Sequence, residues 1–316
     1  MTRPTAPRAV VTSLASAIAV SLGLAVSGCG GAGSDSSDAV VYTEPGVSVS
    51  AEESTSTASA ATASPATATP APAPANTSPA PTGKAEGWGT LKGQVVFGGN
   101  PPPVEELFAK GAAPKDPQVC GKDAPIKSDR LIVDPATKGV KFALVYIPKP
   151  TAVNPEAKSA ASSTDVVFDQ KNCVFEPHVL GVMAGSKVVL KSSDPVTHNV
   201  GAKLKVNNQF NSTLSAGSTM PYTPGSPERT PALVVCDVHP WMQAYWMVLD
   251  NPYYAVTDEQ GNFEIKNVPA GNQRVVVWQE AVGFVTSGSG EDVAIAPNGD
   301  TAKTFTIDPS KVKPAR

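Results

Sequence analysis

The sequence has 316 residues and is poor in charge and in histidine, and both shortages limit what the protein can do. Its 25 basic and 28 acidic residues give a formal net charge of −3, so no basic surface for nucleic acid is expected. No phosphate-binding loop or nucleotide fingerprint is present. Of the three histidines, His178 alone lies outside the motif described next, and no nucleophile motif surrounds it. The sequence therefore predicts neither a nucleic-acid-binding protein nor an enzyme.

The most informative segment is Cys236-Asp-Val-His239-Pro-Trp-Met242, with His198 further upstream. One thiolate, two imidazoles and one thioether are the donors of a type 1 copper site. The loop can place three donors on one side of an ion, and His198 can close the site from another strand. Zinc also binds thiolate and imidazole, but a thioether is a poor zinc ligand. A binuclear copper centre would need a second cysteine on the loop, so the pattern predicts one copper ion.

The segments that flank these residues are typical of strands. Gly185–Lys191 alternates and leads into a polar turn before His198, whereas Ala232–Val235 and Ala244–Leu249 are short apolar runs. We therefore expect the ligand loop to join two neighbouring strands of a β-sandwich, with His198 starting a third strand.

Residues 165–250 resemble a cupredoxin on these motifs. The ligand loop is similar to the amicyanin form, Cys-x2-His-Pro-aromatic-Met, and Phe175–Gly185 resembles the cupredoxin strand that ends in a glycine turn. The sequence departs from the family pattern at Asp237, where Ser or Thr is more usual, and at Val238, where Pro is usual. Neither departure removes a ligand.

The resemblance implies a Greek-key β-sandwich with one type 1 copper ion. By position, the equatorial ligands would be His198, Cys236 and His239, and Met242 would be the weak axial ligand. We expect Asn199, Asp237 and His178 to lie beside the ligands without binding the metal. For His178, a packing role, a ligand role and a role in the electron path remain alternatives. The second histidine of a cupredoxin usually reaches the surface through an apolar patch, which Pro240, Trp241, Met242 and Tyr245 would form here for a redox partner.

The four cysteines divide into three roles. Cys29 ends an apolar run that follows Arg3 and Arg8, and Val26-Ser-Gly-Cys29 resembles a bacterial lipobox. The alternatives are an ordinary cleaved signal and an uncleaved anchor. Cys236 is assigned to copper. Cys120 and Cys173 are expected to form a disulfide, because spare cysteines of exported proteins usually pair, and this requires Cα atoms within roughly 7 Å.

The remaining sequence predicts a tether and a second sandwich. Residues 29–87, after a signal segment at 1–28, are rich in Ser, Thr, Ala and Pro and cannot bury enough apolar surface to fold. Turn signals between short strands in 88–163 and 251–316 predict another β-sandwich. Thr257–Gly271 resembles the carboxypeptidase regulatory-like (transthyretin-like) domain. We therefore interpret these two ranges as halves of one domain, interrupted by the copper domain at 164–250, serving as a scaffold or as a glycan-binding or peptide-binding module.

These patterns predict an all-β, exported protein that is lipid-anchored at a bacterial membrane, facing the periplasm or the exterior. It would carry single electrons as a monomer between redox proteins, such as a cytochrome or an oxidoreductase. Two alternatives remain open. One is a periplasmic protein that binds and delivers copper, and the other is a glycan-binding or structural lipoprotein with a vestigial copper site.

Overall fold

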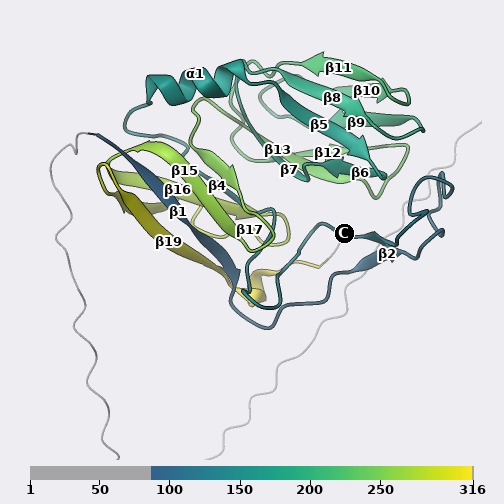
Figure 1. Ribbon diagram of the computed structural model, residues 1–316, viewed down its shortest axis with the longest axis horizontal. Helices are drawn as coiled ribbons and strands as arrows, with labels where there is room; N and C mark the ends of the chain where they lie inside the picture. The colour runs from purple at the N-terminus through teal and green to yellow at the C-terminus, as the bar shows by residue number, and fades with distance from the viewer. Residues whose placement is uncertain (1–86, 315–316) are drawn as a thin grey trace, which may run out of the picture. The chain divides into compact units, whose positions relative to one another are not determined.

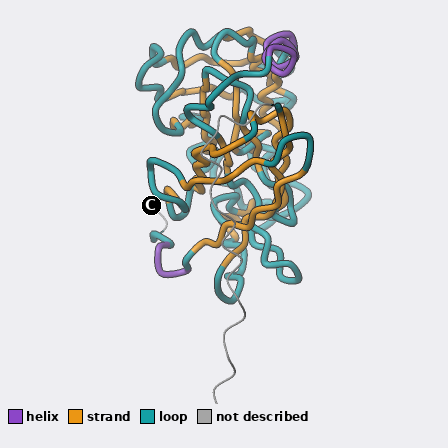
Figure 2. Tube along the Cα trace, turned by 90° about the vertical axis from the view of Figure 1, so that its left-hand side faces the viewer, coloured by secondary structure: helices purple, strands orange, loops and turns teal. Residues whose placement is uncertain are grey.

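The computed structural model describes residues 87–314, and the prediction of an all-β protein is confirmed. The described chain contains 19 strands, the α-helix α1 (Pro155–Ser163) and the 3₁₀ helix η1 (Pro309–Lys311) (Figure 2). Cys29, the predicted signal segment and the tether up to residue 86 lie outside the described residues. Within 87–314, no helix is long and apolar enough to cross a membrane.

The copper-motif residues belong to a sandwich of two sheets (Figure 1). One sheet has the order β11-β8-β5-β6 and the other β10-β9-β12-β13-β7. Alternating burial, as in β8, turns one face of each sheet toward a shared core that includes Phe168, Leu190 and Trp246. The strands are β5 (Val166–Lys171), β6 (Val174–Glu176), β7 (Val179–Met183), β8 (Val188–Ser192), β9 (His198–Ala202), β10 (Phe210–Leu214), β11 (Thr219–Tyr222), β12 (Ala232–Val235) and β13 (Gln243–Leu249).

A second sandwich is built from both ends of the described chain. One sheet has the order β15-β1-β19, and the other has β14-β4-β16-β17, with β18 also paired to β16. Their core includes Leu91, Val95, Ile265 and Val277. The strands are β1 (Trp88–Phe97), β4 (Leu144–Tyr146), β14 (Tyr254–Val256), β15 (Asn262–Pro269), β16 (Gly271–Gln279), β17 (Gly283–Phe284), β18 (Glu291–Ile295) and β19 (Asp300–Ile307).

The copper-motif sandwich is inserted between two neighbouring strands of the second one. The chain leaves at β4 and returns at β14, and these strands pair antiparallel with Tyr146 opposite Tyr254. Two buried contacts hold the crossing points together. The Asn251 side chain donates to the carbonyl of Ile147 at 3.0 Å, and the Tyr253 hydroxyl accepts from the Asn154 backbone N–H at 2.7 Å.

Two local features differ from the patterns in the sequence. The apolar run Lys141–Ile147 is typical of a strand, but only β4 forms within it, because Phe142 has a φ of 62°, outside the β region. Helix α1 was not predicted, although Asn154 caps it by accepting from the N–H groups of Glu156 and Ala157 at 3.0 Å.

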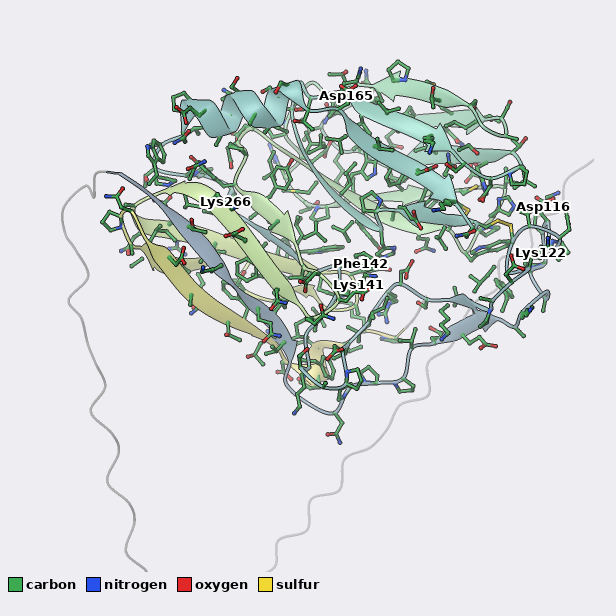
Figure 3. The ribbon with its side chains drawn as sticks, viewed as in Figure 1. Asp116, Lys122, Lys141, Phe142, Asp165 and Lys266 are labelled. Carbon is green, nitrogen blue, oxygen red and sulfur yellow. A yellow bond between two sulfur atoms is a disulfide. The ribbon has the colours of Figure 1, made fainter. Side chains whose placement is uncertain are left out.

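The two sandwiches share a third apolar cluster. Val179, Met247 and Leu249 of the inserted sandwich pack against residues of β4 and β16, and Phe142 lies at the edge of this cluster (Figure 3). The approach of the two sheets is close at Gly181, where an added Cβ would lie 2.3 Å from a ring carbon of Tyr254. Glycine is therefore required in this strand by the neighbouring ring.

Residues 105–127 form a separate segment, with β2 (Glu106–Phe108) paired to β3 (Ile126–Lys127). They fall within the range expected for the first half of the second sandwich. In the structure, however, Ala113, Cys120 and Ile126 are buried in the core of the copper-motif sandwich. Strand patterns in the sequence assign residues 105–127 to the second sandwich. In the structure they pack on the copper-motif sandwich, because their contacts are with residues distant in the sequence.

The first prediction tests the contact at Gly181. Gly181→Ala should lower the free energy of unfolding by about 1–3 kcal/mol, because the new methyl group overlaps the Tyr254 ring. Urea unfolding followed by tryptophan fluorescence measures the change. Gly225→Ala is the control, since its Cβ would meet nothing within 4 Å. Equal midpoints for the two variants would contradict the proposed close approach.

Candidate metal centre

The four predicted ligands are brought together by adjacent strands. β9 begins at His198 and pairs with β12, which ends one residue before Cys236. β12 pairs antiparallel with β13, so the segment from Cys236 to Met242 is the loop between neighbours. Two backbone hydrogen bonds close this loop: the Cys236 N–H donates to the Met242 carbonyl at 3.2 Å, and the Met242 N–H donates to the His239 carbonyl at 2.9 Å.

Three donor atoms converge at the centre of this arrangement. The Cys236 Sγ lies 3.9 Å from Nδ1 of His198 and 3.8 Å from Nδ1 of His239. Metal–nitrogen and metal–sulfur bonds of about 2.0 and 2.3 Å at a trigonal angle would separate nitrogen and sulfur by about 3.7 Å. Both imidazole side chains are 0 % exposed, and Cys236 and Met242 are 1 % exposed. The Cys236 sulfur and the two imidazole nitrogens therefore have the spacing of donors to one metal ion, in a buried position.

Asn199 holds the loop against the strand that carries His198. Its backbone N–H donates to the Cys236 Sγ at 3.5 Å, and its Oδ1 accepts from the backbone N–H groups of Asp237 and Val238 at 2.7 and 3.2 Å. The Asp237 carboxylate in turn accepts from the side-chain amides of Asn199 at 3.3 Å and Asn211 at 2.6 Å. Asn199 therefore contacts both Cys236 and the loop that follows it, and Asp237 helps to orient Asn199.

The outward nitrogen of each imidazole faces a carboxylate that the sequence did not reveal. His198 Nε2 lies 2.8 Å from Asp194 Oδ2, and His239 Nε2 lies 3.0 Å from Asp116 Oδ2. Asp194 belongs to the polar turn before His198, which carries no sign of this contact in its sequence. Asp116 comes from the segment 105–127, and no local pattern connects it with His239.

The charges at the site follow from these contacts. Burial raises the pKa of the Cys236 thiol, but hydrogen bonds with His198 and His239 outweigh it and lower the pKa to about 6. Burial lowers the pKa of His198, but hydrogen bonds with Asp194 and Cys236 raise it to about 9. Burial raises the pKa of Asp194, but hydrogen bonds from His198, Cys173 and Asn172 outweigh burial and lower the pKa below its usual value. The lowered pKa favours the thiolate form of Cys236, which is the form that binds a metal.

The expectation that His239 reaches the protein surface is wrong. Its side chain is 0 % exposed, because Asp116 covers Nε2 and the Trp241 ring lies edge-on at 5.1 Å between ring centroids. The predicted docking residues Pro240, Trp241 and Tyr245 instead line a cleft of about 610 Å³. These residues therefore border a cleft beside the ligand loop, and the His239 ring lies beneath Asp116 and Trp241.

His178 lies away from the donor cluster, at the contact between the two sandwiches. Its Nε2 is 2.6 Å from Glu280 Oε2, and its ring lies 5.2 Å from the Phe142 ring. Both side chains of the pair are nearly buried, at 6 % and 9 % exposure. Among residues 87–314, His178 belongs to no group of side chains that could hold a metal.

Cys120 and Cys173 form a disulfide, with their Cα atoms 5.3 Å apart. The bond joins the segment 105–127 to the hairpin of β5 and β6. The sulfur atoms of both cysteines and a ring nitrogen of His239 lie within 4.8 Å of one another. The disulfide is therefore adjacent to the donor cluster, a position that the sequence did not indicate.

Comparison with known proteins adds partial structural likenesses. No protein-family model matches the chain, and no curated protein matches it. The chain is similar to a purple cupredoxin from Nitrosopumilus maritimus, with 21 % identity, a TM-score of 0.23, and coverage of 27 % of this chain and 99 % of that one. It is similar to amicyanin from Paracoccus versutus, with 17 % identity, a TM-score of 0.25, and coverage of 33 % and 96 %. A copper-containing nitrite reductase from Thermus scotoductus has 20 % identity and a TM-score of 0.25; the match covers 32 % of this chain and only a quarter (25 %) of the reductase.

The second prediction concerns the charge of Cys236. In metal-free protein carrying Cys29→Ser, the ultraviolet absorbance of the thiolate should appear with a midpoint near pH 6. The pKa is lowered because His198 and His239 stabilise the thiolate, so His198→Asn should raise the midpoint. His178→Asn is the matched control, because His178 contacts Glu280 and not the thiol. A midpoint that His198→Asn leaves unchanged would contradict the proposed pairing.

Proposed function

We propose that the protein is an exported type 1 copper protein that carries single electrons. The observation that supports this most directly is the placement of the Cys236 Sγ at 3.8 and 3.9 Å from two imidazole nitrogens in a buried site. When bound, copper would supply one-electron redox chemistry. Cys236, His198 and His239 would be its strong ligands, and Met242 would be the weak axial one.

The surroundings of the ligands favour a carrier over a protein that delivers copper. An electron carrier needs ligands that stay in place when the oxidation state of the metal changes. Here both outward imidazole nitrogens contact carboxylates, and backbone hydrogen bonds close the ligand loop. Release of the metal to another protein would require the covering segment 105–127 to open. The proposed role is therefore electron transfer, with no catalytic step on a substrate.

We further propose that the redox partner approaches through the cleft beside the ligand loop. Trp241 both contacts the His239 ring and lines this cleft. Its Nε1 donates to the Cys173 carbonyl at 3.1 Å, which fixes the ring in this position. Trp241 is therefore the side chain that links a ligand to the cleft, and a small contact of this kind suits transient redox encounters.

Export and anchoring rest on two observations. A disulfide such as Cys120–Cys173 forms and persists in an oxidising compartment. The segment that ends at Cys29 resembles a lipobox, which implies a lipid anchor followed by the Ser-, Thr-, Ala- and Pro-rich tether. The second sandwich, which resembles a carboxypeptidase regulatory-like domain at Thr257–Gly271, would serve as a scaffold for the inserted copper domain.

The third prediction tests the metal assignment. The oxidised, copper-loaded protein should show an intense visible absorption band from charge transfer between the Cys236 thiolate and copper. Cys236→Ser should abolish this band, and Met242→Gln should retain copper while shifting the reduction potential. Met220→Gln is the control, because Met220 lies in β11, outside the ligand loop. This variant should leave the absorption band and the reduction potential unchanged. A copper-loaded wild-type protein without the band would refute the type 1 assignment.

The fourth prediction tests the anchor. The mature chain should begin at a diacylated Cys29 and partition into a detergent phase, and Cys29→Ser should leave the precursor uncleaved. Intact-mass measurement of protein from the membrane fraction checks both results. An unmodified N-terminus at another residue would exclude lipid anchoring and leave the copper assignment untouched.

A further inference from the structure

The histidines of the proposed site differ in where their outward contacts originate. The partner of His198 is Asp194, which lies in the turn just before β9 and belongs to the same sandwich. The partner of His239 is Asp116, which lies in the segment 105–127, outside the strands of that sandwich. Figure 3 shows Asp116 on this loop, close to the yellow sulfur atoms. One histidine is thus oriented locally and the other by a distant segment.

Asp116 occupies a defined turn. Its φ is 50°, a left-handed conformation that aspartate tolerates, and its carbonyl accepts from the N–H groups of Val119 and Cys120 at 2.9 and 2.8 Å. Its side chain is 24 % exposed, whereas the His239 side chain that it contacts is 0 % exposed. The turn therefore places the Asp116 carboxylate over the buried imidazole with its remaining surface toward solvent.

The Cys120–Cys173 disulfide ties this turn to the copper-motif sandwich. Asn172 and Cys173 connect β5 and β6 with φ values of 55° and 56°, as a two-residue hairpin turn requires. Their backbone N–H groups donate to the Asp194 carboxylate at 2.7 and 2.8 Å. The same turn therefore holds Asp194 by hydrogen bonds and the Asp116 segment by a covalent bond, so the two carboxylates are fixed relative to each other.

We propose that Asp116 is a positioning residue for the His239 ligand, supplied by a disulfide-stapled segment that covers the site. The carboxylate holds Nε2 as the protonated nitrogen and leaves Nδ1 free to face the metal and Cys236. Such a contact fixes the ring orientation and makes the imidazole a better donor. The inference rests on the proposed copper function, and it assigns the tuning of His239 to a part of the chain outside the copper domain.

Copper affinity and spectroscopy of the full chain test this role. Asp116→Ala should weaken Cu(II) binding by about 10- to 100-fold in a competition titration with a chelator, and should shift the charge-transfer band. Asp116→Asn keeps an acceptor oxygen for Nε2–H and should restore most of the affinity. Asp123→Asn, an exposed carboxylate in the same segment, should behave as wild type.

A second readout does not require copper. In the metal-free protein, the Nε2–H proton of His239 should give a slowly exchanging nuclear magnetic resonance signal in wild type and in Asp116→Asn. The signal should be lost, or exchange at least tenfold faster, in Asp116→Ala. A merely structural role of Asp116 would change stability without selectively affecting this proton.

The staple is tested by replacing both cysteines with alanine. Cys120→Ala with Cys173→Ala should weaken copper binding in the same direction as Asp116→Ala, and the combined variant should show non-additive effects because the changes act through one contact. If the double cysteine variant does not fold, complete reduction of the folded wild type by dithiothreitol replaces it. Unchanged exchange at His239 after reduction would remove the disulfide from the proposal.

The outcomes separate this inference from the proposed function. A wild-type chain that shows no charge-transfer band would refute the copper function itself. A band that is present, with the same affinity, position and His239 exchange in Asp116→Ala as in wild type, would overturn the role of Asp116 alone.

Discussion

The buried Cys236 thiolate facing two imidazole nitrogens is the interaction on which the rest of the structure depends. Removal of a charge from water costs several kcal/mol unless neighbouring groups compensate. Here His198 and His239 supply that compensation at nearly equal distances of 3.9 and 3.8 Å from the sulfur. The pairing of β9 with β12, the closed ligand loop and the contacts of Asn199 all maintain these distances. A site held in this way needs little rearrangement to accept a metal.

Around the donors, a second set of contacts determines what the site can do. Asp194 contacts Nε2 of His198, and Asp116 contacts Nε2 of His239. Cys173, in the turn between β5 and β6, is connected to both carboxylates: its backbone N–H donates to Asp194, and its sulfur is bonded to Cys120 in the segment that carries Asp116. The same contacts bury His239, which closes the direct route from that ligand to the solvent. Trp241, which contacts His239 and lines the neighbouring cleft, is the residue through which we propose that a partner approaches the loop. Rigidity of the ligands and restricted access arise from the same packing.

The second sandwich contributes a fixed surface against which the inserted sandwich rests. Apolar side chains of β7 and β13 meet those of β4 and β16, and the buried His178–Glu280 pair links the two at 2.6 Å. Because β4 and β14 are hydrogen-bonded neighbours, the two ends of the inserted sandwich lie next to each other. The inserted sandwich is thus joined to the second one by adjacent chain ends, an apolar cluster and a buried polar pair.

Much of this architecture could be read from local patterns. The spacing of Cys236, His239 and Met242, the apolar runs on either side, and His198 before a strand predict the donor set and an all-β fold, because ligand type and strand period are local properties. The even number of spare cysteines likewise predicts the Cys120–Cys173 pair. The interpretation of 88–163 and 251–316 as halves of one interrupted domain came from the resemblance of Thr257–Gly271 to a carboxypeptidase regulatory-like domain. The strand signals and the ligand loop each lie within a few residues of chain, whereas the cysteine pair joins residues 53 apart.

Other features were decided only when distant segments came together. Nothing near Asp116 indicates that its carboxylate will face His239, and nothing near His178 indicates that its partner will be Glu280 in the other sandwich. The attachment of 105–127 to the copper-motif core, and with it the burial of His239, depends on packing between residues far apart in the chain. The proposed donor residues could therefore be named from the sequence alone. The orientation of the ligands and their access to solvent were determined by tertiary contacts, because hydrogen bonds and burial depend on which surfaces meet and not on local spacing.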